Sequence, residues 1–274
     1  MADRQILQKL FGEIMGVPVS GKHAIEVATF VVVFQRPFST RAVGALSTLQ
    51  ETLRADFPSF QTTNVNVIEF RIGDGVPQSP VAGPISGVLL QRIGSDGKPS
   101  WTLKAEGNAL LVQCFAYETW VTTSHQALKF LQTAINIVAD EENPPVVLAH
   151  QIIDRFVASK DGYEIGHVFN KRSEFISKHA LTAGLLWHVF QGWFEHSNSA
   201  TGQLLNVLNL STNETPSGIV TTIDHNAQFQ SAGISNSDAT NPEWLKGVFD
   251  ELHAQNKEIV GNLLNVKQKK AVGL

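Results

Sequence analysis

The sequence predicts an α+β protein with two similar halves, each a mostly antiparallel sheet backed by a long helix. Two observations predict this class. Short β-branched and aromatic runs occur in groups separated by tight turns, and one long stretch of helical periodicity follows each group. The order strand, excursion, three-strand meander and long helix occurs in 1–143 and again in 144–274. No repeat of individual residues accompanies this duplication, so the halves are expected either as two domains or as one continuous domain.

In the first half, β-branched and aromatic runs predict strands, and apolar residues at helical spacing predict helices. The predicted order is a helix near 6–14, a strand at 25–34, a helix over 40–57, a strand that begins at 65 and closes at 73, an irregular loop over 76–84, a meander at 88–93, 101–104 and 110–117, and a helix through 124–138. Asn143, which is followed by two prolines, ends this half.

The second half follows this order more loosely. Its predicted elements are a strand at 146–157, a polar excursion through 162–178, a meander at 185–194, 204–210 and 219–229, and a helix over 241–265. In the last strand of the meander, alternate residues from Ile219 to Phe229 share one face. His225 therefore lies on that face, and Asp224 points to the opposite side.

The composition limits the classes of partner. Charged residues make up 17% of the 274 residues, and the formal net charge is −4. The surface is therefore either rich in neutral polar groups or covered by a large interface. The net charge argues against nucleic acid and anionic membranes as partners, and Lys267, Lys269 and Lys270 are expected to form a solvated tail.

Features of the N-terminal segment and of the apolar runs predict a cytoplasmic protein. Charged residues interrupt the first apolar stretch, which leaves no signal-peptide core. No window reaches the length of uninterrupted apolar sequence that a membrane-spanning helix needs. The single cysteine, Cys114, excludes an intramolecular disulfide and lies in an apolar run, so we expect a buried and unreactive thiol.

Motifs for common cofactors and nucleophiles are missing from the sequence. There is no glycine-rich phosphate loop and no dinucleotide fingerprint between a strand and a helix. There is no nucleophile elbow, and the nine histidines do not show the spacing of a zinc site. We therefore expect no cofactor and no metal site, and an enzyme is the less favoured interpretation.

Three residues are the best of the weak catalytic candidates. Glu118 lies close to Trp120. Asp250 and His253 are three residues apart on the final predicted helix and therefore share one face. They are the basis of an alternative function, that of a metal-dependent hydrolase or nuclease.

The final helix also carries a candidate interface. Leu245, Leu252 and Ile259 are spaced seven residues apart, and Asn256 lies within the same apolar stripe. A polar Asn in such a stripe could pair with its copy in a homodimer and fix the register. The other interpretation is that the helix packs on its own sheet and that Asn256 bonds the sheet or water.

Several short segments resemble a family of bacterial and archaeal proteins of unknown function that is distributed sporadically and has about this length. The segments are Val27–Phe34, Pro37-Phe38, Leu53-Arg54, Phe57-Pro58, Tyr117-Glu118-Thr119-Trp120, Trp244, Phe249-Asp250-Glu251-Leu252-His253 and Gly273-Leu274. The resemblance covers nearly the whole chain and implies a protein of the prokaryotic or phage cytosol. It supplies no reaction, and a role in mobile or defence-associated genes would rest on analogy alone.

The leading hypothesis is a non-enzymatic binding or assembly protein that acts through a protein surface. Its partner is either another protein or a second copy, which would make it a homodimer. The metal-dependent hydrolase or nuclease is one alternative. A sensor that binds a small molecule between the two halves is the other.

Overall fold

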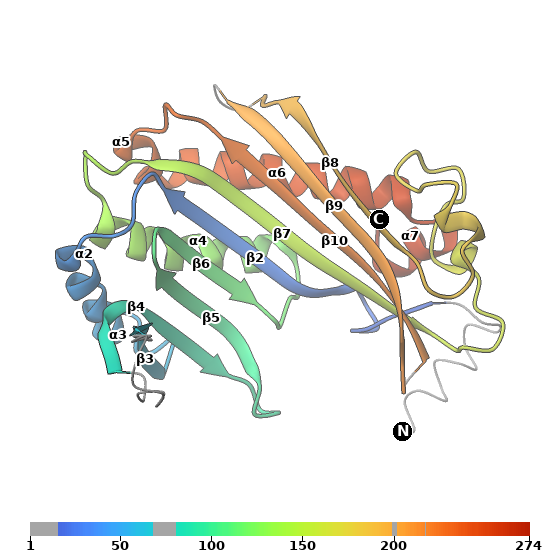
Figure 1. Cartoon of the computed structure of the whole chain (residues 1–274), viewed down its shortest axis with the longest axis horizontal. Coiled ribbons are helices and arrows are strands. Elements are labelled where there is room, and N and C mark those ends of the chain that lie inside the picture. Colours follow the sequence, from blue (N-terminus) through green and yellow to red (C-terminus); the bar gives the residue numbers. More distant parts are fainter. Residues whose placement is uncertain (1–15, 68–80, 199–201, 217) are drawn as a thin grey trace, which may run out of the picture. The chain divides into compact units, whose positions relative to one another are not determined.

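The structure is a computed structural model that describes residues 16–67, 81–198, 202–216 and 218–274 (Figure 1). It is an α+β protein with a large antiparallel sheet and a few helices, as the sequence predicts. The helix expected near 6–14 lies outside the described residues. No helix in the described ranges is both long and apolar enough to cross a membrane.

The chain divides into two compact units that are discontinuous in sequence. The first unit holds the described residues within 1–28, 149–230 and 248–274, and the second holds those within 29–148 and 231–247. The predicted halves, 1–143 and 144–274, do not coincide with these units. The reason is that β7 (Pro145–Ala158) begins in the second unit and ends in the first. Its end pairs with β1 (Val17–Pro18), which joins the N-terminal residues to the first unit. Near its start, the Val146 carbonyl accepts a hydrogen bond from the Ser231 N–H, which joins the segment from Ser231 to the second unit.

The second unit contains most of the predicted first-half meander. Its strands pair in the order β3 (Ser59–Val67), β4 (Val81–Ile93), β5 (Pro99–Glu106), β6 (Ala109–Cys114) and β2 (Ile25–Phe34). Its helical segments are α2 (Thr40–Ala45), the 3₁₀ turn η1 (Leu46–Thr48), α3 (Leu49–Thr52), α4 (Trp120–Val138) and α5 (Asn236–Ala239). Phe130 on α4 packs 4.6 Å from Phe57 and 5.7 Å from Trp101, measured between ring centroids. These rings join α4 to the sheet and to the segment after α3.

The first unit is a sheet with α6 packed on one face. Its strands pair in the order β7, β10 (Gly218–Gln230), β9 (Gln203–Thr215) and β8 (His188–His196). The other elements are α6 (Pro242–Leu263), whose last two-thirds belong to this unit, α7 (Val266–Val272) and the 3₁₀ turns η2 (Ile165–His167) and η3 (Ala180–Thr182). Leu208 on β9, Ile223 on β10 and Ile259 on α6 belong to one buried cluster. We call the face that bears this cluster the inner face.

Most predicted elements are confirmed, and the boundaries differ where the sequence signal was ambiguous. The strand at 25–34 has the predicted bounds, and the turns at Gly97 and Gly107 have the positive φ that glycine allows. The strand expected from 65 begins at Ser59, because polar residues of β3 pair with β4 across a bulged register. The prediction of a loop over 76–84 is wrong for its last residues, because β4 already begins at Val81.

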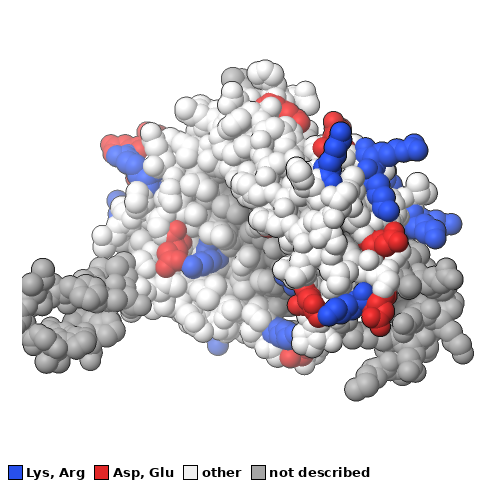
Figure 2. Space-filling model, turned by 45° about the vertical axis from the view of Figure 1, so that its right-hand side comes forward, with Lys and Arg blue, Asp and Glu red and all other residues white. Residues whose placement is uncertain are grey.

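Charged side chains are sparse on the surface. Figure 2 shows broad areas without Lys, Arg, Asp or Glu, with the charged side chains in small groups. This distribution agrees with the charged fraction of 17% and leaves neutral surface that can serve for binding.

Candidate functional site

The structure divides the three catalytic candidates between the two units. Glu118 is exposed, lies between β6 and α4, and belongs to the second unit. Asp250 and His253 lie on the part of α6 that belongs to the first unit. Among the described residues, no group of three or more His, Cys, Asp or Glu side chains could hold a metal ion.

Burial sets the chemistry of His253. Burial and the nearby Lys257, opposed by Asp250, together lower the pKa of His253 to about 4. The ring centroid of His253 lies 6.0 Å from that of His150, which is itself buried on β7. A neutral imidazole packed beside a second, buried histidine ring is typical of core histidines.

The four candidate interface residues of α6 are buried within their own chain. Leu245, Leu252, Asn256 and Ile259 have between 0% and 5% of their surface exposed. Ile259 belongs to the buried cluster of the first unit. The burial favours the second interpretation of this helix, in which α6 packs on its own sheet, because side chains covered in this way have no surface to offer a second copy.

Asn256 takes part in a buried hydrogen-bond chain. Its side-chain nitrogen lies 3.3 Å from Nδ1 of His225, and Nε2 of His225 lies 3.1 Å from Oδ1 of Asn206. All three residues are buried on the inner face of the first unit. Burial lowers the pKa of His225 to about 4, so the ring stays neutral at physiological pH. This chain of hydrogen bonds is therefore a structural feature of the core.

One surface of the first unit is unusually apolar. The outward side chains of β8 are His188, Phe190, Gly192, Phe194 and His196, and all five are exposed. Phe190 and Phe194 are 69% and 61% exposed, which is rare for phenylalanine. β8 is the last strand in the pairing order and bonds only to β9 within the described chain. We call these five residues the outward row of β8.

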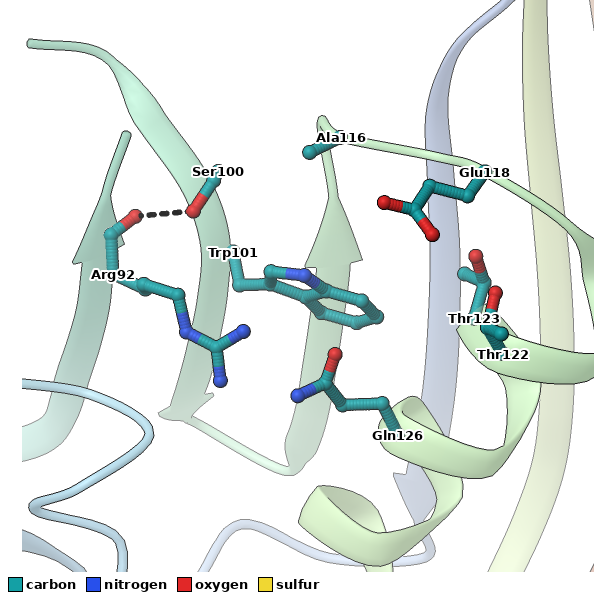
Figure 3. A pocket seen from close by; sticks show the side chains of 8 residues that line it. All are labelled: Arg92, Ser100, Trp101, Ala116, Glu118, Thr122, Thr123 and Gln126. Atoms are coloured by element: carbon teal, nitrogen blue, oxygen red, sulfur yellow. Dashed lines mark hydrogen bonds between the residues drawn. The ribbon is translucent and has the colours of Figure 1, made fainter. Parts of the chain in front are cut away.

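The second unit carries a pocket of about 250 Å³ that includes Glu118 (Figure 3). Its walls come from β4, β5, the segment after β6 and the first turns of α4. The lining residues are Arg92, Ser100, Trp101, Ala116, Glu118, Thr122, Thr123 and Gln126. In the view of Figure 3, Arg92 and Gln126 lie below the Trp101 ring, and Glu118 lies to its upper right.

Arg92 is held in place by several partners. It donates from Nε to the Asp56 carbonyl at 2.7 Å and from Nη2 to the Asp56 carboxylate at 3.0 Å. Its guanidinium lies 5.8 Å from the ring centroid of Phe57 and 5.9 Å from that of Phe130. Lys129 also pairs with Asp56, at 2.8 Å. This arrangement fixes one edge of the pocket before any ligand arrives.

Sequence reasoning found Glu118 but missed the other pocket residues and the outward row of β8. Arg92 and Gln126 are far apart in sequence and meet through strand pairing and the packing of α4. The outward row was within a predicted strand at 185–194, and its alternation of His, Phe and Gly was visible there. The sequence did not predict that this strand lies at the end of the pairing order.

Comparisons with known proteins leave the function open. No family model matches the chain, and no curated protein matches it, which agrees with the resemblance to a family of unknown function. Among solved structures, DynU16, a protein in the dynemicin biosynthetic locus, is 10% identical; the match covers 84% of this chain and 98% of that one, with a TM-score of 0.20. StfQ, the di-domain ARO/CYC from the steffimycin biosynthetic pathway, is 8% identical over 90% of this chain and 99% of that one, with a TM-score of 0.19.

Proposed function

We propose that this chain is a binding and assembly protein that pairs with a second copy of itself through the free edge of β8. The observation that carries the proposal is the symmetry of the outward row. Read from either end, the row is His, Phe, Gly, Phe, His, with Gly192 at its centre. A surface that is its own complement about a twofold axis is what a symmetric homodimer requires.

The symmetry defines a register for the pairing. If two β8 strands run antiparallel with the twofold axis at Gly192, Gly192 faces its own copy. Phe190 then lies opposite Phe194 of the second copy, and His188 lies opposite His196 of the second copy. Each aromatic pair occurs twice, and such cross-strand pairs typically contribute about 0.2–1 kcal/mol each.

The edge of β8 lacks the usual protection against pairing. Natural edge strands are blunted by lysine, proline, a bulge or short length. β8 has none of the first three, and its register with β9 is regular over nine residues. Its one charged side chain, Glu195, lies on the face opposite the outward row and accepts a hydrogen bond from Trp193. At the other end of the pairing order, β3 has register shifts around Asn64. An edge that can accept a strand therefore exists at β8 and is disturbed at β3.

The surface beside the outward row favours an apolar partner. Phe194 pairs in register with Leu205 on β9, and Gly192 pairs with Val207. Leu205 and Val207 are half-buried and face the same side as the outward row. Leu186, just before β8, is 57% exposed and extends the apolar character. No charged side chain lies in the outward row, so two copies can approach without repulsion.

The oligomeric state of the full chain, measured by light scattering over a range of concentrations, tests the proposal. We expect a shift from the 29.9 kDa monomer towards twice that mass as concentration rises. Phe190→Lys places a cation in the aromatic contact of both copies and is expected to abolish the shift. Val121→Lys is the matched control, because Val121 is 75% exposed on α4. A monomer at all concentrations, or a dimer that Phe190→Lys leaves intact, would overturn the proposal.

Cross-linking tests the register directly. The double variant His188→Cys/His196→Cys places cysteines opposite each other at both ends of the paired strands. Directly opposed residues have Cα atoms about 4.5–5.5 Å apart, within the range of a disulfide. We expect the double variant to form a disulfide-linked dimer on mild oxidation and each single variant to remain unlinked. Equal linking by either single variant would contradict this register.

A further inference from the structure

The pocket of the second unit has hydrogen-bonding groups that the fold does not use. Ser100 donates to the carbonyl of Arg92 at 3.1 Å (Figure 3), and Thr122 donates to the Thr119 carbonyl at 3.2 Å. These hydroxyls therefore serve the fold. The groups left for a ligand lie at the two ends of the pocket, around Arg92 and at Glu118.

The Arg92 end of the pocket offers donors. The amide orientation of Gln126 that satisfies both side chains places its oxygen 3.2 Å from Nη1 and 3.1 Å from Nη2 of Arg92, which turns the amide over relative to Figure 3. Together with the bonds to Asp56, this leaves one Nη1 hydrogen of Arg92 unused. The Gln126 NH₂ group then points away from Arg92. This end suits a carboxylate or a carbonyl group of a ligand.

The Glu118 end of the pocket offers an acceptor. Glu118 is exposed and forms no ion pair with any described residue. By contrast, Asp56 is shared between Arg92 and Lys129, so the cations of this region are already partly neutralised. A carboxylate at a pocket wall that pairs with no described residue suits a protonated amine of a ligand.

Trp101 lies between the two ends in Figure 3. Trp101 is 5% exposed and packs edge-on against Phe130, so its position is fixed by the core. With so little of its surface exposed, Trp101 forms a fixed part of the pocket wall and offers a ligand little ring surface of its own. The pocket volume of about 250 Å³ limits the ligand to a small metabolite.

We infer that this pocket binds a small zwitterion, such as a free amino acid. Its carboxylate lies towards Arg92 and Gln126, and its ammonium group lies towards Glu118. The site lies within the second unit and is independent of the β8 edge. This inference therefore goes beyond the proposed assembly and does not depend on it.

Calorimetric titration of the full chain with the common L-amino acids, L-phenylalanine first, tests the inference. Phenethylamine, which lacks the carboxylate, and 3-phenylpropanoate, which lacks the amine, are the matched analogues. We expect the amino acid to bind at least tenfold more tightly than either analogue, because each analogue leaves one charged end unpaired. Absence of binding by every amino acid, or equal binding by an analogue, would overturn the inference.

Glu118→Gln keeps the shape of the side chain and removes its charge. We expect it to weaken binding of the amino acid about tenfold or more and to leave the affinity for 3-phenylpropanoate unchanged. Glu141→Gln, at another exposed position of the same unit, is the control and is expected to bind normally. Circular dichroism checks that both variants are folded. Unchanged affinity in Glu118→Gln would assign the ammonium group to another site and would contradict the inference.

Discussion

Asn256 on α6 places its side-chain nitrogen 3.3 Å from Nδ1 of His225 on β10. An amide nitrogen can only donate, so Nδ1 of His225 is the acceptor and the ring proton is on Nε2. Nε2 in turn donates to Oδ1 of Asn206 at 3.1 Å. The three side chains form one directed chain of hydrogen bonds across the interface between α6 and the sheet, and this chain fixes the position of α6 along its axis.

Asn256→Ala is expected to lower the free energy of unfolding by about 1–3 kcal/mol, because it leaves a buried imidazole nitrogen without its donor. The oligomeric mass of the variant is expected to equal that of the unaltered chain. Urea unfolding and light scattering measure the two quantities. Glu258→Ala, at an exposed position on the same helix, is the control and should change neither. If Asn256→Ala had an altered oligomeric mass but normal stability, α6 would have to be an interface between two copies of the chain.

In this chain of hydrogen bonds, the sequence predicted the face on which His225 lies but not the partners of its side chain. The alternation of β10 predicted the face on which His225 lies, and that prediction is confirmed. The partners of His225 are 19 and 31 residues away, on elements whose contact depends on the tertiary fold. The stripe that contains Asn256 predicted an amphipathic helix, but an apolar stripe fits a sheet and a second helix equally well.

Cys114 is buried on β6, and burial raises the pKa of its thiol to about 11. Only the thiolate reacts, so a disulfide reagent at pH 8 should modify the native protein at least roughly 100-fold more slowly than the urea-unfolded protein. The release of the reagent's coloured thiol measures both rates. The unfolded chain serves as its own control, and comparable rates in the two states would show that the thiol is accessible. A slow native reaction also leaves cysteines added on β8 as the reactive ones.

The order of the elements was largely predictable, and the order of the strands in space was not. The strand at 25–34 and the helix through 124–138 follow directly from local periodicity. The position of β8 at the end of the pairing order depends on which distant strand each edge meets, and local sequence carries no such information. Glu118 was found because it is a carboxylate close to Trp120 in the sequence, whereas Arg92 reaches the same pocket only through strand pairing.

Asp154 is a buried carboxyl group on β7, and burial raises its pKa to about 7 from an ordinary value near 3.8. Between these pH values the folded state keeps a proton that the unfolded state has lost, so stability falls as pH rises through this window. Asp154→Asn removes the titration. We expect the free energy of unfolding of the variant, minus that of the unaltered chain, to be about 2–3 kcal/mol higher at pH 8 than at pH 5.

Urea unfolding at the two pH values measures this difference, and Asp161→Asn, an exposed aspartate in the same unit, is expected to show none. His225 acts in the opposite sense in a different window. Its folded pKa of about 4 lies below the ordinary value of 6.5, so its contribution to stability is lost as pH falls from 6.5 towards 4. A pH-independent effect of Asp154→Asn would show that the carboxyl group does not titrate where its burial predicts.

Gly218 begins β10 with a φ of +124°, and a Cβ atom added there would lie 2.2 Å from the backbone oxygen of Ala158. Backbone cannot move aside as a flexible side chain can, so Gly218→Ala is expected to lower the free energy of unfolding by roughly 2–4 kcal/mol. Gly184→Ala is the matched control: its φ is also positive, at +80°, but no atom lies within 4 Å of the added carbon. The cost at Gly184 should therefore be about 1 kcal/mol, from the backbone conformation alone. Equal losses in the two variants, measured by urea unfolding, would mean that the close approach of β10 to the end of β7 at Ala158 contributes nothing beyond local strain.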